Sequence, residues 1–91
     1  MANKIDVKIK KELETGWVFG VTVGELGFEV EVEKSFWQKL TAGKEEPAEL
    51  VRRSFDFLLA REPKESILRR FNLKQISDYF PEYEGEIGFT P

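Results

Sequence analysis

The 91-residue chain is 41% apolar and 13% aromatic, which predicts one folded domain with one hydrophobic core and excludes intrinsic disorder. It contains neither histidine nor cysteine, so disulfides and the commonest catalytic and metal-binding side chains are absent. A net charge of −3 disfavours general coating of nucleic acid, because such binding requires clustered lysine and arginine. The N-terminal sequence is charged where a signal peptide would be apolar, and no apolar run approaches 20 residues, so we expect a cytoplasmic protein with no membrane partner.

Residues 4–34 alternate apolar and polar side chains, which is the pattern of half-buried strands. Glycine-containing turns at Gly16 and at 24–27 divide this region into three runs. Short turns of this kind predict an antiparallel meander with one apolar face. The inward positions of the three runs are Ile5, Val7 and Ile9, then Trp17, Phe19, Val21 and Val23, then Phe28, Val30 and Val32.

Residues 35–80 repeat their apolar positions at helical spacing and are predicted to cover that face. Ser35 and Gln38 have the spacing of a capping box and predict a two-turn helix that closes at Gly43. Pro47 predicts the start of the main helix, residues 47–62, and Pro63 its end. Two further short helices are predicted, one over Ile67, Leu68 and Phe71 and one that begins with a capping box at Asn72 and Gln75.

The acidic tail, residues 81–91, alternates aromatic or aliphatic residues with glutamates and is predicted to be either frayed or an added edge strand. The fold prediction is therefore a two-layer α+β domain spanning residues 1–91, with a three-stranded antiparallel β-meander followed by four helices. The predicted shared core comprises Trp17, Phe19, Val21, Phe28, Val30, Phe55, Leu58 and Leu59.

The order of three strands followed by one amphipathic helix, over about the first 60 residues, resembles in outline the small domain of HicB-type antitoxins. That family has a proline- and glycine-rich segment between its second and third strands. Here the corresponding segment is Gly24-Glu25-Leu26-Gly27, and the C-terminal half offers no clear DNA-reading helix-turn-helix. The resemblance therefore assigns no family.

The outward face of the second strand carries Val18, Gly20 and Thr22, which are small or apolar. The neighbouring outward faces carry lysines on the first strand and Glu29, Glu31 and Glu33 on the third. This arrangement predicts a shallow groove with charged borders, and a glycine inside a strand often marks the close approach of a ligand or another backbone. The alternatives for the same residues are a plain exposed sheet face or a dimerisation surface.

A second candidate surface is the basic strip of residues 61–74, which contains Arg61, Lys64, Arg69, Arg70 and Lys74. Such a strip would bind nucleic acid if its side chains shared one face. The row of glutamates on the third strand is expected to be a solvated face, because a straight row diverges where a cation site needs converging oxygens. We expect no metal and no cofactor.

These patterns predict a small protein-interaction or regulatory module that lacks catalytic activity, with another protein or a second copy as its partner. The alternative is a nucleic-acid-binding domain that uses the basic strip. Catalysis ranks last, because it would need carboxylates that converge in a pocket, and no motif predicts one.

Overall fold

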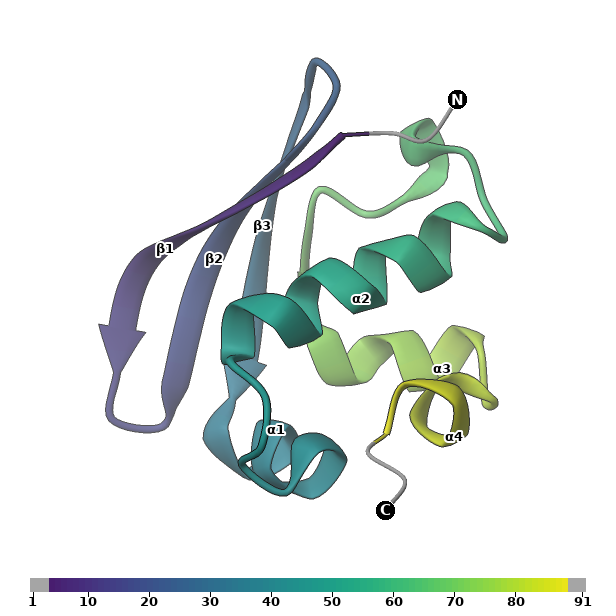
Figure 1. Ribbon diagram of the computed structural model, residues 1–91. Helices are drawn as coiled ribbons and strands as arrows, with labels where there is room; N and C mark the ends of the chain where they lie inside the picture. Colours follow the sequence, from purple (N-terminus) through teal and green to yellow (C-terminus); the bar gives the residue numbers. More distant parts are fainter. Residues whose placement is uncertain (1–3, 89–91) are drawn as a thin grey trace.

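The structure is a computed structural model that describes residues 4–88 (Figure 1). An α+β fold is confirmed: the strands form one sheet, and the helices of Figure 1 lie on one side of it. The strands are β1 (Ile5–Leu13), β2 (Gly16–Val23), β3 (Leu26–Glu33) and β4 (Arg70–Asn72). The helices are α1 (Lys34–Thr41), α2 (Pro47–Leu59), α3 (Ile76–Tyr79) and α4 (Tyr83–Ile87), with 3-10 turns η1 (Lys64–Ser66) and η2 (Leu73–Gln75).

The antiparallel meander forms as predicted, with β2 between β1 and β3. Gly24 adopts a φ of +60°, which explains the glycine in the second turn. Gly16 is required for a different reason, since a side chain there would collide with the carbonyl oxygen of Val32. The two turns therefore depend on glycine through backbone conformation in one case and close backbone approach in the other.

The prediction of a helix over Ile67, Leu68 and Phe71 is wrong, and the sheet has a fourth strand. Arg70–Asn72 pairs with β3 in parallel, and the backbone amide of Glu29 donates to the carbonyl of Arg69 at 2.7 Å. A parallel neighbour needs a long crossover, which α1 and α2 supply. Phe71 points into the core while its two neighbours in β4 are less buried, so this short strand follows the period of the rest of the sheet.

Burial along the edge strand β1 differs from the predicted alternation. Ile5 is buried and Val7 is partly buried, but Ile9 is 57% exposed. The register shifts between Ile9 and Lys11, so Lys10 is an extra residue in a β-bulge. A bulge and a run of lysines on an edge strand both discourage pairing with a second sheet.

The helix boundaries differ slightly from the predicted ones. Helix α1 begins at Lys34, with Glu33 as its N-cap and no side-chain cap, so the predicted capping box at Ser35 is wrong. Helix α2 ends at Leu59, three residues earlier than predicted. The capping box of Asn72 and Gln75 is confirmed, because both of its hydrogen bonds are present.

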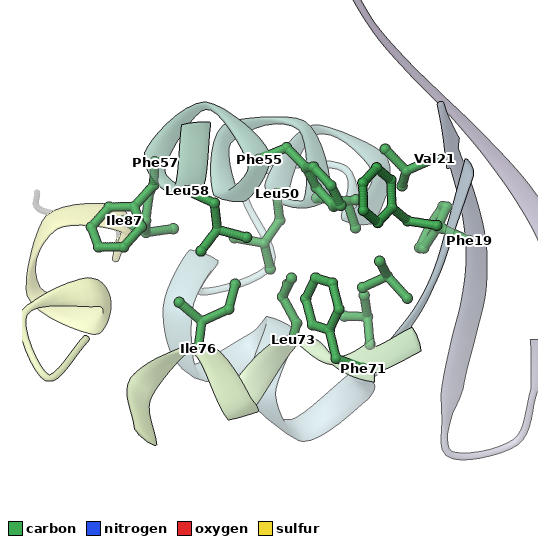
Figure 2. Close-up of a cluster of buried hydrophobic side chains, with 14 of the residues drawn as sticks. Phe19, Val21, Leu50, Phe55, Phe57, Leu58, Phe71, Leu73, Ile76 and Ile87 are labelled. Atoms are coloured by element: carbon green, nitrogen blue, oxygen red, sulfur yellow. The ribbon is translucent and has the colours of Figure 1, made fainter. Parts of the chain in front are cut away.

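Helix α2 packs its apolar face against the sheet on one side and against η2 and α3 on the other (Figure 2). Phe55 is completely buried, and its ring lies 5.3 Å from the Phe28 ring and 6.0 Å from the Phe71 ring. Six of the eight predicted core residues are buried. The other two, Trp17 and Leu59, are partly buried and pack against the core from its margin.

The tail forms helix α4, so both predicted alternatives are wrong for the part that the structure describes; Phe89 lies outside that part. Tyr83 is completely buried, and its hydroxyl lies 2.6 Å from the Ser54 hydroxyl. Phe36 stacks on the Tyr83 ring at 6.4 Å and Phe57 meets it edge-on at 5.2 Å. Tyr83, which would have been one of the alternating residues of the predicted edge strand, instead begins helix α4 and anchors it in the core.

Candidate functional site

A hollow of about 520 Å³ lies on the uncovered face of the sheet and covers part of the predicted groove. Gly20 and Thr22 line this sheet-face groove, but Val18, which lies on the same face, does not. Arg69 and Arg70 also line it, so the structure brings together part of the two surfaces that the sequence predicted separately. The remaining lining residues are Asp6, Lys8, Lys10, Val21, Gly27, Phe28 and Glu29.

Gly20 lets a side chain of β1 reach across β2. The Lys10 stem lies over Gly20, and its ammonium nitrogen is 3.0 Å from a carboxylate oxygen of Glu29. This hydrogen bond and charge hold the pKa of Glu29 below its usual value. A carboxyl group that acts as a general acid near neutral pH needs a raised pKa. The pKa of Glu29 is instead lowered, which does not suit that role.

The basic strip does not form one free surface. Lys64 pairs with Glu25 at 3.3 Å, and Lys74 pairs with Glu33 at 2.7 Å. Arg61 lies away from the sheet, 3.6 Å above the Phe57 ring. These three cations face different elements, which weakens the case for a continuous phosphate-binding stripe.

The two central arginines of the strip are the ones at the sheet-face groove. Arg69 donates to the carbonyl of Gly27 at 3.3 Å, and its guanidinium lies 5.6 Å from the Phe28 ring. Arg70 is highly exposed, and its closest carboxylate is Glu29 at 3.9 Å. Of the described residues, two lysines, two arginines and two carboxylates line the groove, so its surface is of mixed charge.

A second hollow, which the sequence did not reveal, lies where α2, α3 and the segment before β4 meet. We call it the α2–α3 pocket; its volume is about 150 Å³. Its lining residues are Leu58, Glu62, Ser66, Ile67, Leu68, Phe71, Gln75, Ile76, Tyr79 and Phe80. Leu58 comes from the end of α2, Phe71 from β4 and Ile76 from the start of α3, and all three are nearly buried. The pocket is therefore predominantly apolar.

Two apolar side chains at the α2–α3 pocket are turned toward solvent. Leu68 is 50% exposed and Tyr79 is 65% exposed. Within residues 4–88 the third large exposed apolar side chain is Ile9, which lines neither hollow. Single exposed apolar residues are ordinary on protein surfaces, but two beside one apolar hollow mark a candidate binding site.

The sequence contained a partial signal for this pocket. Ile67 and Leu68 are adjacent apolar residues, and Ile67 has an extended backbone. In extended backbone two adjacent side chains point to opposite sides, so only one of the pair can face the core. Ile67 is buried and Leu68 is exposed. Their predicted assignment to a helix hid this, because a helix can accommodate neighbouring apolar residues on a wide face.

Three other kinds of site are conceivable within residues 4–88: a metal site, a reactive hydroxyl pair and a membrane-spanning helix. No group of carboxylates there is arranged to hold a metal ion. The hydroxyls of Ser54 and Tyr83 form a close pair, but both residues are completely buried. Between residues 4 and 88 none of the helices is long and apolar enough to cross a membrane.

Ion pairs on the surface predict how stability depends on pH. Hydrogen bonds from Lys39 and Ser77 lower the pKa of Glu84, and Lys74 lowers the pKa of Glu33. A lowered pKa in the folded state stabilises the fold above the unfolded-state value of about 4.3, and this contribution is lost as pH falls below it. We expect the free energy of unfolding, measured with urea, to decrease from pH 6 to pH 3.

A variant pair isolates this effect. Glu84→Gln should flatten the acid side of the pH profile more than Glu31→Gln, because Glu31 has no ion-pair partner among residues 4–88. Equal slopes for the two variants would contradict the assignment of acid sensitivity to the Glu84 contacts.

Comparison of the chain with models of known protein families, with curated proteins and with solved structures finds no match. Any functional assignment therefore depends on the geometry of the two hollows.

Proposed function

We propose that the protein is a small protein-binding module and that the α2–α3 pocket receives an apolar side chain of its partner. The observation that carries the proposal is the position of Leu68 and Tyr79 beside one apolar hollow; they are two of the three large exposed apolar side chains within residues 4–88. Tyrosine is enriched among the residues that dominate binding energy at protein interfaces.

The size of the pocket supports a protein partner over a metabolite. Pockets for small molecules usually have volumes of about 300–1,000 Å³. A volume of about 150 Å³ is smaller and matches a single ring, since a cavity of roughly that volume can hold benzene. One aromatic or large aliphatic side chain would fill it, with the rest of the partner lying over Leu68 and Tyr79.

The test is affinity capture from the source cell with matched surface variants, with and without nuclease treatment. Leu68→Glu and Tyr79→Ser should each lose a partner protein that the wild type retains. Ile9→Glu should retain it, because Ile9 is equally exposed but lies outside the pocket. All three variants should keep the wild-type circular dichroism spectrum.

Retention of the partner by Leu68→Glu and Tyr79→Ser would contradict the role of the pocket. Capture of nucleic acid alone would instead favour the alternative function, nucleic-acid binding through Arg61, Lys64, Arg69, Arg70 and Lys74. That alternative is less well supported, since three of these cations have carboxylate partners within 3.5 Å. Its affinity would also fall steeply with rising salt concentration.

A further inference from the structure

The α2–α3 pocket has an acidic side. Among the lining residues within 4–88 Glu62 is the one that carries a charge, and no basic side chain in that range pairs with it. Two other acids, Glu65 and Asp78, are the chain neighbours of the lining residues Ser66 and Tyr79 and likewise lack an ion-pair partner among the described residues. One carboxylate without an ion-pair partner thus lines the pocket, and two more are adjacent in the chain to residues that line it.

The basic residues closest to the pocket in the chain are directed elsewhere. Arg70 precedes Phe71, but its nearest carboxylate within residues 4–88 is that of Glu29 on β3, at 3.9 Å. Arg69 follows Leu68, but its guanidinium donates to the carbonyl of Gly27 on the sheet. Lys74 precedes Gln75, but its ammonium pairs with Glu33 on β3. Lys64 is held by Glu25 at the turn between β2 and β3. These cations therefore do not neutralise the acids at the pocket.

Arg61, the neighbour of Glu62 in the chain, is shared between two other carboxylates. Its Nη2 atom lies 2.7 Å from a Glu86 carboxylate oxygen, and its Nε atom lies 3.4 Å from one of Glu82. Arg61 thus pairs with two carboxylates, so the cluster of Arg61, Glu82 and Glu86 has a net negative charge. Its stacking on the Phe57 ring fixes the guanidinium toward α4.

The end of helix α2 does not add to this negative charge. Leu58 lines the pocket from the last turn of α2, which contains no basic residue of its own. Just beyond that turn, however, Arg61 Nη1 donates to the carbonyl of Phe57 at 3.1 Å and offsets the partial negative charge of the helix end. The negative charge beside the apolar pocket therefore comes from its carboxylates.

From these charges we infer the chemistry of the partner: a segment in which an aromatic or large aliphatic residue is flanked by lysine or arginine. The inference rests on the proposed protein-binding function and specifies its ligand. The apolar residue enters the α2–α3 pocket, and the flanking cations lie against Glu62 and the neighbouring carboxylates. Charge complementarity at such an interface improves specificity and the rate of association.

Three peptides test this in titrations followed by amide chemical shifts of the 15N-labelled protein at about 50 mM salt. The first is Ac-Lys-Lys-Phe-Lys-Lys-NH2, the second replaces every lysine with glutamate, and the third replaces phenylalanine with alanine. We expect the first to shift the amides of Leu68, Ile76 and Tyr79 and to bind more tightly than the other two. Glu62→Gln should weaken its binding roughly two- to fivefold, whereas the control Glu31→Gln should not.

The outcomes separate the two proposals. Equal binding of the lysine and glutamate peptides at the pocket would overturn the inferred charge preference and leave the apolar pocket as a binding site. Equal shifts from the phenylalanine and alanine peptides would show attraction by charge alone and would overturn the inference. No shift at the pocket with either phenylalanine peptide would overturn both the inference and the proposed binding site.

Discussion

Phe55→Ala is expected to lower the free energy of unfolding by about 3 to 5 kcal/mol, the range measured when large buried aromatic residues are truncated. Phe55 has no exposed surface and joins three elements, since its ring contacts Phe28 on β3 and Phe71 on β4. Small domains are stabilised by only about 5 to 15 kcal/mol in total. We therefore expect a large fall in the urea midpoint or loss of the cooperative transition.

A control in the same helix separates core truncation from loss of helix propensity. Leu59→Ala removes an apolar side chain that is only partly buried, so its destabilisation should be clearly smaller. Alanine favours the helix in both variants, so the difference between them reports packing. A Phe55→Ala variant within about 1 kcal/mol of the wild type would contradict the position of Phe55 at the centre of the core.

The long elements could be predicted from the sequence because each repeats its pattern several times. β3 alternates from Phe28 to Glu33, and α2 repeats apolar residues over three turns. β4 has only three residues, which are too few to show a period. Phe71 has the spacing of a helical stripe relative to Ile67 and Leu68, so the sequence favours a helix there. The segment is a strand because it pairs with β3, which lies more than 35 residues earlier in the chain.

Of the two candidate sites, one could be predicted from a local sequence pattern and the other could not. The sheet-face groove could be predicted because Gly20 and Thr22 lie on one strand, and alternation alone places them on one face. The α2–α3 pocket could not, because it is assembled from the end of α2, β4 and α3. Exposure of Leu68 and Tyr79 is a property of that assembly. The adjacent pair Ile67 and Leu68 indicates an exposed side chain only once that segment is known to be extended, and Tyr79 has no local pattern that distinguishes it from a core residue.

Tyr83→Ala is expected to destabilise the fold by about 3 to 5 kcal/mol as well, although the residue belongs to an acidic tail near the end of the chain. Tyr83 is completely buried between the rings of Phe36 and Phe57, and its hydroxyl meets that of Ser54. Truncation would leave a cavity under α4. The same urea measurement checks this value, with Tyr79→Ala as the control, because Tyr79 is 65% exposed and should contribute little to stability.

Tyr83→Phe separates the ring from the hydroxyl. It should cost about 1 kcal/mol, since the ring contacts remain and Ser54 can still donate to the carbonyl of Leu50 at 2.7 Å. Burial raises the pKa of the Tyr83 hydroxyl well above its usual value of about 10, so folding opposes ionisation. Wild-type stability should therefore fall as pH rises above about 10, and Tyr83→Phe should lose that part of the decline. If Tyr83→Ala is no more destabilising than Tyr79→Ala, helix α4 is not anchored in the core, and the tail is frayed.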